Sequence, residues 1–411
     1  MLLWDLFKGL ELNFTPTLER VRKACQKAGN PQNSYPSVIV GGTNGKGSTT
    51  AFLERLYRYH GLKTGRFVSP HLVDETERWR IDNVPIDEET LKVYVNRIKP
   101  LMEEFKLTYF ESAVCIASLL FKDEGVDIAV VEAGLGGRWD ASKVHSPLVT
   151  AITNVGLDHT KWLGETLEEI ANDKTELIYP NRPIILGTDE EPLFSIAQKK
   201  ARDRNSPLIV ARRDYTFEGF AQFPQTVLEY YSYKGFKVEK VKLGLFGVKQ
   251  IENASLALTI FLESAKFLGI EPDPQKVKRA LEETRWEGRF EIVRKKPLLV
   301  LDGAHNLHAL KGTLESLRTL KEFPLIIYGT MRDKDWKKQL GFIRKYTDRI
   351  GLVEIDYHRS ERIQNLYPFA VGLGFREIRT YKSVREMVEN LTEDAIVLGS
   401  LYLLGEVKKF L

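Results

Sequence analysis

Residues 38–49 read VIVGGTNGKGST, and this stretch decides the fold of the amino-terminal part of the chain. The β-branched run predicts a buried strand, the glycines predict a tight loop, and the pattern from Thr49 to Tyr59 predicts a helix. Glycines let backbone N–H groups converge on phosphate oxygens, and the positive end of a following helix faces the same oxygens. The stretch therefore indicates a phosphate-binding loop in an α/β domain.

The loop departs from the usual P-loop spelling, G-x-x-x-x-G-K-[ST]. Here Gly47 separates Lys46 from the hydroxyls of Ser48 and Thr49. Lys46 can still supply a mobile charge for the β and γ phosphates of ATP, and Ser48 or Thr49 can bind Mg²⁺. The alternative is a glycine-rich turn with a surface lysine. The residues expected to hold the nucleotide are Thr43, Asn44, Gly45, Lys46, Gly47, Ser48 and Thr49.

Short apolar strands alternate with helical patterns beyond this loop. Continuous apolar strands between helices indicate a mainly parallel sheet that is covered on both faces. Residues 214–243 differ, because aromatic and polar residues alternate there, and they predict a small antiparallel hairpin set. The further strands expected in the first sheet are residues 127–132, 148–153, 183–186 and 207–210.

The strand–helix rhythm restarts after residues 285–289, with a strand expected at residues 297–302. We predict a P-loop NTPase-like ATP-binding domain over residues 1–290, with the antiparallel subdomain attached. A smaller Rossmann-like α/β domain is predicted over residues 291–411.

Composition excludes several classes of function. A net charge of +4 over 411 residues is too small to indicate a nucleic-acid partner. Cys25 and Cys115 match no metal-binding or redox spacing and fit a reducing compartment. The amino-terminal stretch carries acidic residues unlike a signal peptide, and no apolar run reaches membrane-spanning length. We expect a cytoplasmic protein without a membrane partner.

Polar residues stand where two predicted strands end. Glu132 ends one apolar strand, and His159 follows the next, so both side chains are expected at the same sheet edge. A buried carboxylate is costly unless it meets a cation such as Mg²⁺. Lys174 interrupts the apolar stripe of the helix predicted at residues 166–179. From the pattern alone, Lys174 is either a lysine that reaches solvent or a functional group.

The segment GTNGKGST resembles the ATP loop of the Mur ligase superfamily, in particular its folate branch of folylpolyglutamate and dihydrofolate synthases. The resemblance extends from residues 29–31 to residues 399–402, through SPHL at 69–72, TYFE at 108–111 and LDGAHN at 301–306. It implies an ATP-dependent ligase that adds L-glutamate to the γ-carboxylate of folates through an acyl phosphate. It also implies a monomer, and it leaves open whether dihydropteroate is a second substrate.

The resemblance assigns roles to individual residues. ATP would act with two Mg²⁺ ions, and Lys174 would be carbamylated by CO₂ to serve the metal site. The implied metal ligands are Ser48, Ser69, Glu132, His159 and Lys174. The implied catalytic residues are Lys46, Lys174, Arg289 and His305. Asn253 would contact the adenine, and Arg289 and Asp302 would also bind the nucleotide.

The substrate side follows from the same resemblance. The residues implied for folate, dihydropteroate or glutamate are His71, Arg78, Arg80, Thr108, Phe110, Asp140, Ala141, His305 and Ser400. Read without the resemblance, Asp302 and His305 lie at a strand-to-helix turn, where they could face a cleft or cap the next helix. Several positions depart from the family's pattern: Trp139, Thr175, Glu176, Lys249, Glu287 and Leu307.

Two other functions stay open at this point. One is a different Mur-type carboxylate–amine ligase. The folate branch is favoured because only about forty residues precede the ATP loop, which is too few for the nucleotide-sugar domain of a peptidoglycan ligase. The other is a nucleotide-binding regulator that makes no amide. The set of Glu132, His159 and Lys174 argues against a regulator, because a binding module has little use for a second metal.

Overall fold

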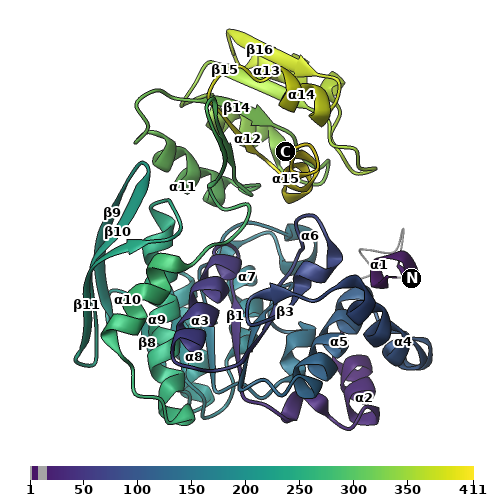
Figure 1. The fold of residues 1–411 in the computed structure, drawn as a ribbon, viewed down its shortest axis with the longest axis vertical. Coiled ribbons are helices and arrows are strands. Elements are labelled where there is room, and N and C mark those ends of the chain that lie inside the picture. Colours follow the sequence, from purple (N-terminus) through teal and green to yellow (C-terminus); the bar gives the residue numbers. More distant parts are fainter. Residues whose placement is uncertain (1, 8–15) are drawn as a thin grey trace. The chain divides into compact units, whose positions relative to one another are not determined.

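The computed structural model describes residues 2–7 and 16–411 and divides into two compact units (Figure 1). Part of the stretch that we compared with a signal peptide, residues 8–15, lies outside the described residues. Among the described helices, none combines the length and apolar character needed to cross a membrane. Unit 1 comprises residues 1–218, 228–241 and 252–284, and unit 2 comprises residues 219–227, 242–251 and 285–411.

Unit 1 is built on an eight-stranded sheet. Its strands, in spatial order, are β4 (Val84–Pro85), β3 (Trp79–Ile81), β2 (Thr64–Phe67), β5 (Ile128–Glu132), β1 (Ser37–Gly41), β6 (Val149–Ile152), β7 (Ile184–Leu186) and β8 (Leu208–Val210). The six strands from β2 to β8 are parallel, which confirms the mainly parallel sheet. The β3–β4 hairpin adds an antiparallel edge that the sequence did not reveal.

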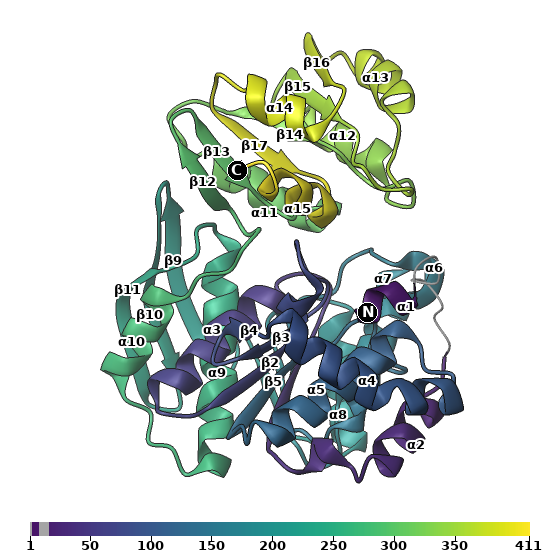
Figure 2. The same cartoon turned by 45° about the vertical axis from the view of Figure 1, so that its right-hand side comes forward.

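Helices cover both faces of this sheet, and Figure 2 shows α3 and α5 on opposite faces. The helices of unit 1 are α1 (Leu3–Leu6), α2 (Glu19–Lys27), α3 (Lys46–Tyr59), α4 (Glu88–Phe105), α5 (Tyr109–Asp123), α6 (Thr160–Leu163), α7 (Leu167–Lys174), α8 (Leu193–Asp203), α9 (Lys249–Leu268, whose first turn belongs to unit 2) and α10 (Pro274–Glu283). On the face toward α2, α4 and α5, the strands bury Ile39, Phe67, Ala129 and Val131.

The aromatic segment forms a separate three-stranded sheet of β9 (Thr216–Gln222), β10 (Gln225–Tyr233) and β11 (Phe236–Leu243). Neighbouring strands joined by such short connections must be antiparallel, which confirms the predicted hairpin set. The sheet packs on α9 through Tyr231, whose hydroxyl lies 2.7 Å from Thr259 Oγ1, and through Tyr233, which donates to Glu263 at 2.5 Å.

Unit 2 holds a six-stranded sheet. Its order is β12 (Glu291–Lys295), β13 (Leu298–Leu301), β17 (Ala395–Leu398), β14 (Leu325–Tyr328), β15 (Arg349–Val353) and β16 (Glu377–Tyr381). All neighbours are parallel except β12 and β13, as expected for a Rossmann-like domain. Its helices are α11 (Leu307–Leu317), α12 (Trp336–Ile343), α13 (Ile363–Gly372), α14 (Val384–Asn390) and α15 (Leu401–Lys408).

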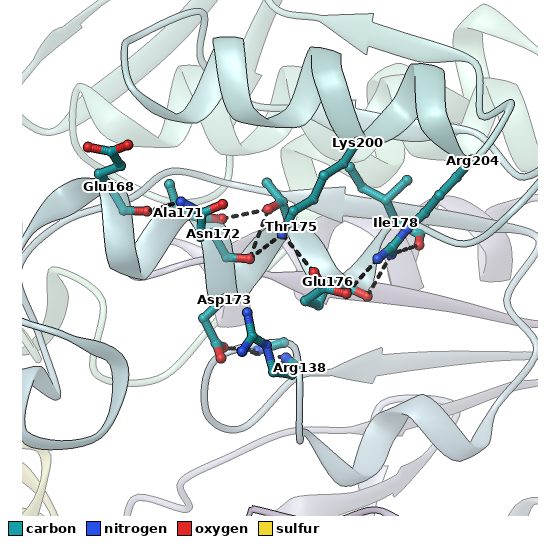
Figure 3. Close-up of polar contacts among 11 residues, drawn as sticks. Arg138, Glu168, Ala171, Asn172, Asp173, Thr175, Glu176, Ile178, Lys200 and Arg204 are labelled. Atoms are coloured by element: carbon teal, nitrogen blue, oxygen red, sulfur yellow. Dashed lines mark hydrogen bonds and ion pairs between the residues drawn. The ribbon is translucent and has the colours of Figure 1, made fainter.

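The helix predicted at residues 166–179 is α-helical only to Lys174, and a 3₁₀ turn, η4 (Thr175–Leu177), follows it. The acidic residues on either side of Lys174 hold this region in place (Figure 3). Asp173 accepts the backbone N–H of Gly137 at 2.8 Å, and Glu176 accepts Lys200 of α8 at 2.7 Å. Burial opposes ionisation of Glu176, but its bonds to Lys200 and Arg204 lower its pKa to about 2.

Gly137→Ala is expected to destabilise unit 1 by about 2–3 kcal/mol. A Cβ at Gly137 would lie 2.7 Å from the carbonyl oxygen of Lys174 and 2.8 Å from that of Asp173, and backbone atoms cannot swing aside. Urea unfolding of the variant measures this loss. Gly341→Ala in α12 is the control, because a Cβ there meets open space. If Gly137→Ala and Gly341→Ala unfolded at the same urea concentration, the tight packing inferred for Gly137 would be contradicted.

Candidate functional site

The phosphate-type loop leaves β1 and enters α3 with Gly45 as the N-cap residue, at a φ of 86°. Residues beyond β6 brace it. Asn154 accepts the N–H of Asn44 at 3.1 Å through its side chain, and its carbonyl oxygen accepts the N–H of Thr43 at 3.0 Å. Thr153 donates its hydroxyl to the carbonyl oxygen of Asn44 at 2.6 Å. The sequence analysis did not identify Thr153 or Asn154 as residues that hold the loop. Two polar residues directly after an apolar strand could have indicated them.

The predicted adenine contact, Asn253, lies directly beside the loop. A Cβ on Gly45 would stand 2.4 Å from Asn253 Oδ1. This close approach, together with the positive φ of Gly45, explains why glycine is required there. The structure therefore brings α9 to the start of α3, as a nucleotide site at this position needs.

Two lysines converge on one carbonyl oxygen. Lys46 Nζ donates to the carbonyl oxygens of Gly42 at 3.2 Å and Thr43 at 3.3 Å, and it lies 4.0 Å from Glu132 Oε1. Lys174 Nζ donates to the same Gly42 oxygen at 3.0 Å. Two ammonium groups at one acceptor repel each other, so the arrangement favours an anion at the loop or loss of one proton.

Lys174 is buried, with 5% of its surface exposed, so it does not reach solvent along its helix. Burial and, next, the charge of Lys46 lower the pKa of Lys174 to about 7. A substantial fraction of Lys174 is therefore an uncharged amine at neutral pH. An uncharged amine is the form that acts as a nucleophile.

Ser48 and Thr49, in the first turn of α3, are buried. Within the described residues, neither Ser48 Oγ nor Thr49 Oγ1 has a hydrogen-bond partner. Glu132 ends β5 beside Val40 of β1 and is 5% exposed. Buried hydroxyls without partners and a buried carboxylate are oxygen ligands of the kind that Mg²⁺ prefers. The residues present at this position therefore fit the ion.

The other two predicted ligands are less enclosed. Ser69 follows β2 at the same sheet edge and is half-buried, whereas His159 is the N-cap residue of α6 and is exposed. The described ranges contain no group of three or more His, Cys, Asp or Glu side chains that could hold a metal. Ser48, Glu132 and Lys174 thus lie at the loop, and the metal roles of all five residues, with Ser69 and His159, stay predictions.

The SPHL segment forms an ordered loop. The Glu77 carboxylate accepts three successive backbone N–H groups, those of Leu72, Val73 and Asp74, at 2.7–2.9 Å. His71 Nδ1 accepts Arg78 Nε at 3.0 Å, and burial and then Arg78 lower the pKa of His71 to about 3. Both predicted folate-side residues therefore contact each other.

The remaining predicted substrate residues of unit 1 have structural partners. Arg80 donates to the carbonyl oxygens of Glu77 and Asn83, each at 3.2 Å. Thr108 caps α5 in a reciprocal pair with Glu111. Phe110 packs over Gly134 at the end of β5.

Asp140 is 2% exposed and accepts the N–H groups of Leu135 and Ser142, and Ala141 is part of the core. The pterin-pocket roles of Asp140 and Ala141 stay predictions.

Unit 2 gathers its predicted residues at the carboxyl edge of β13 and β17. Asp302 accepts Phe290 N at 2.9 Å and Thr313 Oγ1 at 2.8 Å. Arg289 lies over Gly303, where a Cβ would stand 2.2 Å from its Nη1.

His305 Nδ1 lies 2.8 Å from the carbonyl oxygen of Gly303. Ser400 caps α15, and Gly399 donates to the carbonyl oxygen of Ala304 at 2.9 Å. Asn306, not His305 or Asp302, caps α11. The structure brings Arg289, Asp302, His305 and Ser400 to one edge of the sheet.

The chain matches two protein families. Residues 40–261 match the family described as Mur ligase middle domain, and residues 288–401 match Mur ligase, glutamate ligase domain.

Curated relatives extend the similarity to almost the whole chain. The chain is 30% identical to the dihydrofolate synthase/folylpolyglutamate synthase of Escherichia coli, over 95% of this chain and 90% of that protein. It is also 30% identical to a probable bifunctional folylpolyglutamate synthase/dihydropteroate synthase of Haloferax volcanii, over 98% of this chain. The chain spans 49% of the length of that relative.

Solved structures agree. The crystal structure of folylpolyglutamate synthase from Thermotoga maritima is 29% identical and superposes with a TM-score of 0.88, covering 100% of this chain and 96% of that one. A structure titled FPGS-AMPPCP-folate complex is 26% identical with a TM-score of 0.87, and covers 100% of this chain and 99% of that one. The similarity thus includes a protein solved with a nucleotide and a folate.

Lys174→Met is expected to raise the free energy of unfolding at pH 7 in CO₂-free buffer, and to do so less at pH 10. The pKa of Lys174 is about 7 in the folded chain and about 10.4 when unfolded, so the unfolded chain binds more protons between those values. The lysine therefore costs about 3–5 kcal/mol at pH 7, and this cost is lost as pH rises toward 10.

Urea unfolding of both proteins at pH 7 and pH 10 measures this difference. Lys199→Met, at an exposed position of α8, is the control and should behave like the wild type at both pH values. A Lys174→Met effect of the same size at pH 7 and pH 10 would contradict a depressed pKa at Lys174.

Proposed function

Because the chain belongs to the Mur ligase family, in its folylpolyglutamate and dihydrofolate synthase branch, we propose that it adds L-glutamate to the γ-carboxylate of folates with ATP. The observation that carries this proposal is the loop at Gly42, where the ammonium groups of Lys46 and Lys174 meet at one carbonyl oxygen beside the N-terminus of α3. The similarity to a nucleotide- and folate-bound protein supports the substrate class.

In this proposal, unit 1 binds ATP. The N-terminus of α3 directs backbone N–H groups at the phosphates, and Lys46 can leave the Gly42 carbonyl for them. Asn253 contacts the adenine. Ser48 and Glu132 would hold one Mg²⁺, and Ser69, His159 and Lys174 would serve a second. When bound, Mg²⁺ neutralises developing charge on the transferred phosphoryl group.

The chemistry is the activation of a carboxylate. The folate carboxylate oxygen attacks the γ-phosphorus of ATP, the bond to the ADP oxygen breaks, and an acyl phosphate forms. The amine of glutamate then attacks the acyl carbon and releases phosphate, giving an amide. Lys46 stabilises the charge in the first step, and Arg289 of unit 2 is proposed to assist it.

The second amide partner is assigned to unit 2. Asp302, His305 and Ser400 share one sheet edge and are proposed to receive ATP and the incoming glutamate. His305 is half-buried, and its Nδ1 lies at the carbonyl oxygen of Gly303, which orients the ring. On the folate side we propose His71, Arg78, Arg80, Thr108, Phe110, Asp140 and Ala141.

Lys174 is proposed to carry a carbamate. Its uncharged amine attacks the carbon of CO₂, a C–N bond forms as one C=O π bond becomes a carboxylate oxygen, and the nitrogen releases one proton, so a neutral amine becomes an anionic carbamate. The pKa of about 7 supports this step, because the reactive form is populated at neutral pH. The change would also remove the repulsion between Lys46 and Lys174.

We further propose that residues 1–290 act as the ATP-binding domain and residues 291–411 as the glutamate ligase domain of a monomer. The two family matches, over residues 40–261 and 288–401, support this division.

ADP release tests the function directly. The purified protein is incubated with ATP, Mg²⁺ and glutamate, with either tetrahydrofolate or dihydropteroate added. Release with the folate alone means a dedicated folylpolyglutamate synthase, and release with both means a bifunctional enzyme. Release with neither contradicts the proposal and points to another carboxylate–amine pair.

Lys46→Met is expected to lower folate-dependent ADP release by roughly 10²–10³-fold, the usual cost of removing one group that stabilises transition-state charge. The circular dichroism spectrum should be unchanged, because the hydrogen bonds that the structure describes for the Lys46 ammonium end on two carbonyl oxygens of its own loop. Lys122→Met, at an exposed position of α5, is the control and should keep full activity. Comparable rates for the two variants would remove Lys46 from the mechanism.

A further inference from the structure

Arg66 is a fully buried arginine that the proposed chemistry does not use. It lies on β2, and its side chain has no exposed surface. Its Nη2 donates to Asn83 Oδ1 of the β3–β4 hairpin at 2.9 Å. An arginine is rarely buried unless acidic groups compensate it, so its neighbours indicate its role.

The face of the sheet that carries Arg66 is known from its neighbours. Thr64, two residues earlier on the same strand, donates to Glu54 Oε1 of α3 at 2.9 Å. Side chains two apart on a strand share a face, so Arg66 also points to the α3 side. Phe67, on the other face, belongs to the core beneath α4 and α5.

Glu132 lies on the same face as Arg66. In the parallel register of β2 and β5, Arg66 is the partner of Val130, and Glu132 follows Val130 by two residues. Such diagonal neighbours are within reach of a long side chain such as arginine. Arg66 is therefore placed between Glu54, which α3 supplies, and the carboxylate at the end of β5.

The charges agree with this placement. Burial lowers the pKa of Arg66 to about 10, Glu54 and Glu132 both oppose that shift, and Arg80 adds to it. Glu54 has a second basic neighbour, because Arg58 Nε lies 3.6 Å from its Oε1. Glu132 also has a second basic neighbour, because Lys46 Nζ lies 4.0 Å from its Oε1.

Lys46 cannot serve two anions equally. When it turns to the phosphates of ATP, its hold on Glu132 weakens. Arg66 also faces Glu54, but both of its carboxylate neighbours belong to the protein, and the hydrogen bond to the hairpin fixes the arginine on β2. It can keep a positive charge beside the Glu132 carboxylate throughout the reaction.

We propose that Arg66 is a positioning residue for Glu132: it supplies the permanent counter-charge that holds the magnesium ligand at the nucleotide loop. The proposal rests on the proposed function only in taking Glu132 as a magnesium ligand. It requires neither folate nor glutamate.

The test is ADP binding by calorimetry, with Mg²⁺ and again with EDTA. The readout is the gain in ADP affinity that Mg²⁺ provides. For Arg66→Met this gain is expected to fall roughly 10–100-fold, the usual effect of removing a residue that holds a metal ligand, while metal-free ADP binding is unchanged. Arg66→Lys should restore part of the gain.

The matched control is Arg58→Met. Arg58 also neighbours Glu54, but it is partly exposed on α3 and also lies 3.8 Å from Asp82 of the hairpin. It should leave the Mg²⁺-dependent gain at the wild-type value. If Arg66→Met does not fold, the double variant Glu54→Gln, Arg66→Met replaces it, because that variant removes both charges of the buried pair.

Three outcomes would overturn the proposal. Arg66→Met, or the double variant, could keep the wild-type gain. Arg58→Met could reduce the Mg²⁺-dependent gain in ADP affinity as much as Arg66→Met does. The loss would then follow from removing any positive charge near Glu54, and not from Arg66 in particular. The ADP affinity of the wild-type protein could be independent of Mg²⁺, which would exclude Glu132 as a magnesium ligand at the nucleotide loop. A protein that binds MgADP but fails to glutamylate folate would contradict the proposed function alone.

Discussion

The carbonyl oxygen of Gly42 receives hydrogen bonds from two lysine side chains, Lys46 and Lys174, at 3.2 and 3.0 Å. One lysine belongs to the loop and the other to α7, more than a hundred residues later. Their repulsion in a buried site has to be relieved by an anion, by deprotonation or by chemical change. The rest of the site is arranged around this constraint. Glu132, the brace from Asn154, and the Gly134–Arg138 segment all hold the two lysines or their loop in place.

The same pair of lysines bears on how the sheet edge at the nucleotide loop could support the proposed ligase reaction. Phosphoryl transfer needs fixed positive charge more than it needs a dedicated acid or base, because charge spreads over the transferred group. We propose that unit 1 supplies that charge from Lys46 and the α3 N-terminus, and that Ser48 and Glu132 would hold a Mg²⁺ ion that adds to it. Unit 2 presents Asp302, His305 and Ser400 on a second sheet edge of similar design. We propose that unit 1 activates the folate carboxylate and that unit 2 receives the incoming glutamate.

Much of this could be predicted from the sequence, because strand–loop–helix order and apolar periodicity are local. The 38–49 stretch gave the nucleotide loop, and the position of Glu132 at the end of an apolar strand gave a buried carboxylate. Lys174 stood out only because it interrupts an apolar stripe. Whether it reached solvent depended on the packing of α7 against the loop, which no local pattern contains.

The remaining contacts depend on register between strands that are distant in sequence. Arg66 looks ordinary in the sequence, and only its pairing with Val130 places it beside Glu132. The bracing role of Asn154 and the structural bonds of Arg80 and Asp140 likewise require the tertiary fold. The antiparallel β3–β4 edge was missed because its strands are too short to carry a periodic signal.

In the proposed mechanism, the glycine-rich loop and its Lys46 activate a folate carboxylate for attack by glutamate. Mass spectrometry of tetrahydrofolate monoglutamate after incubation with the protein, ATP, Mg²⁺ and glutamate tests it most directly. The account predicts a product heavier by one or more glutamate residues, with one ADP formed for each residue added. An unchanged folate, with or without ADP formation, would contradict it.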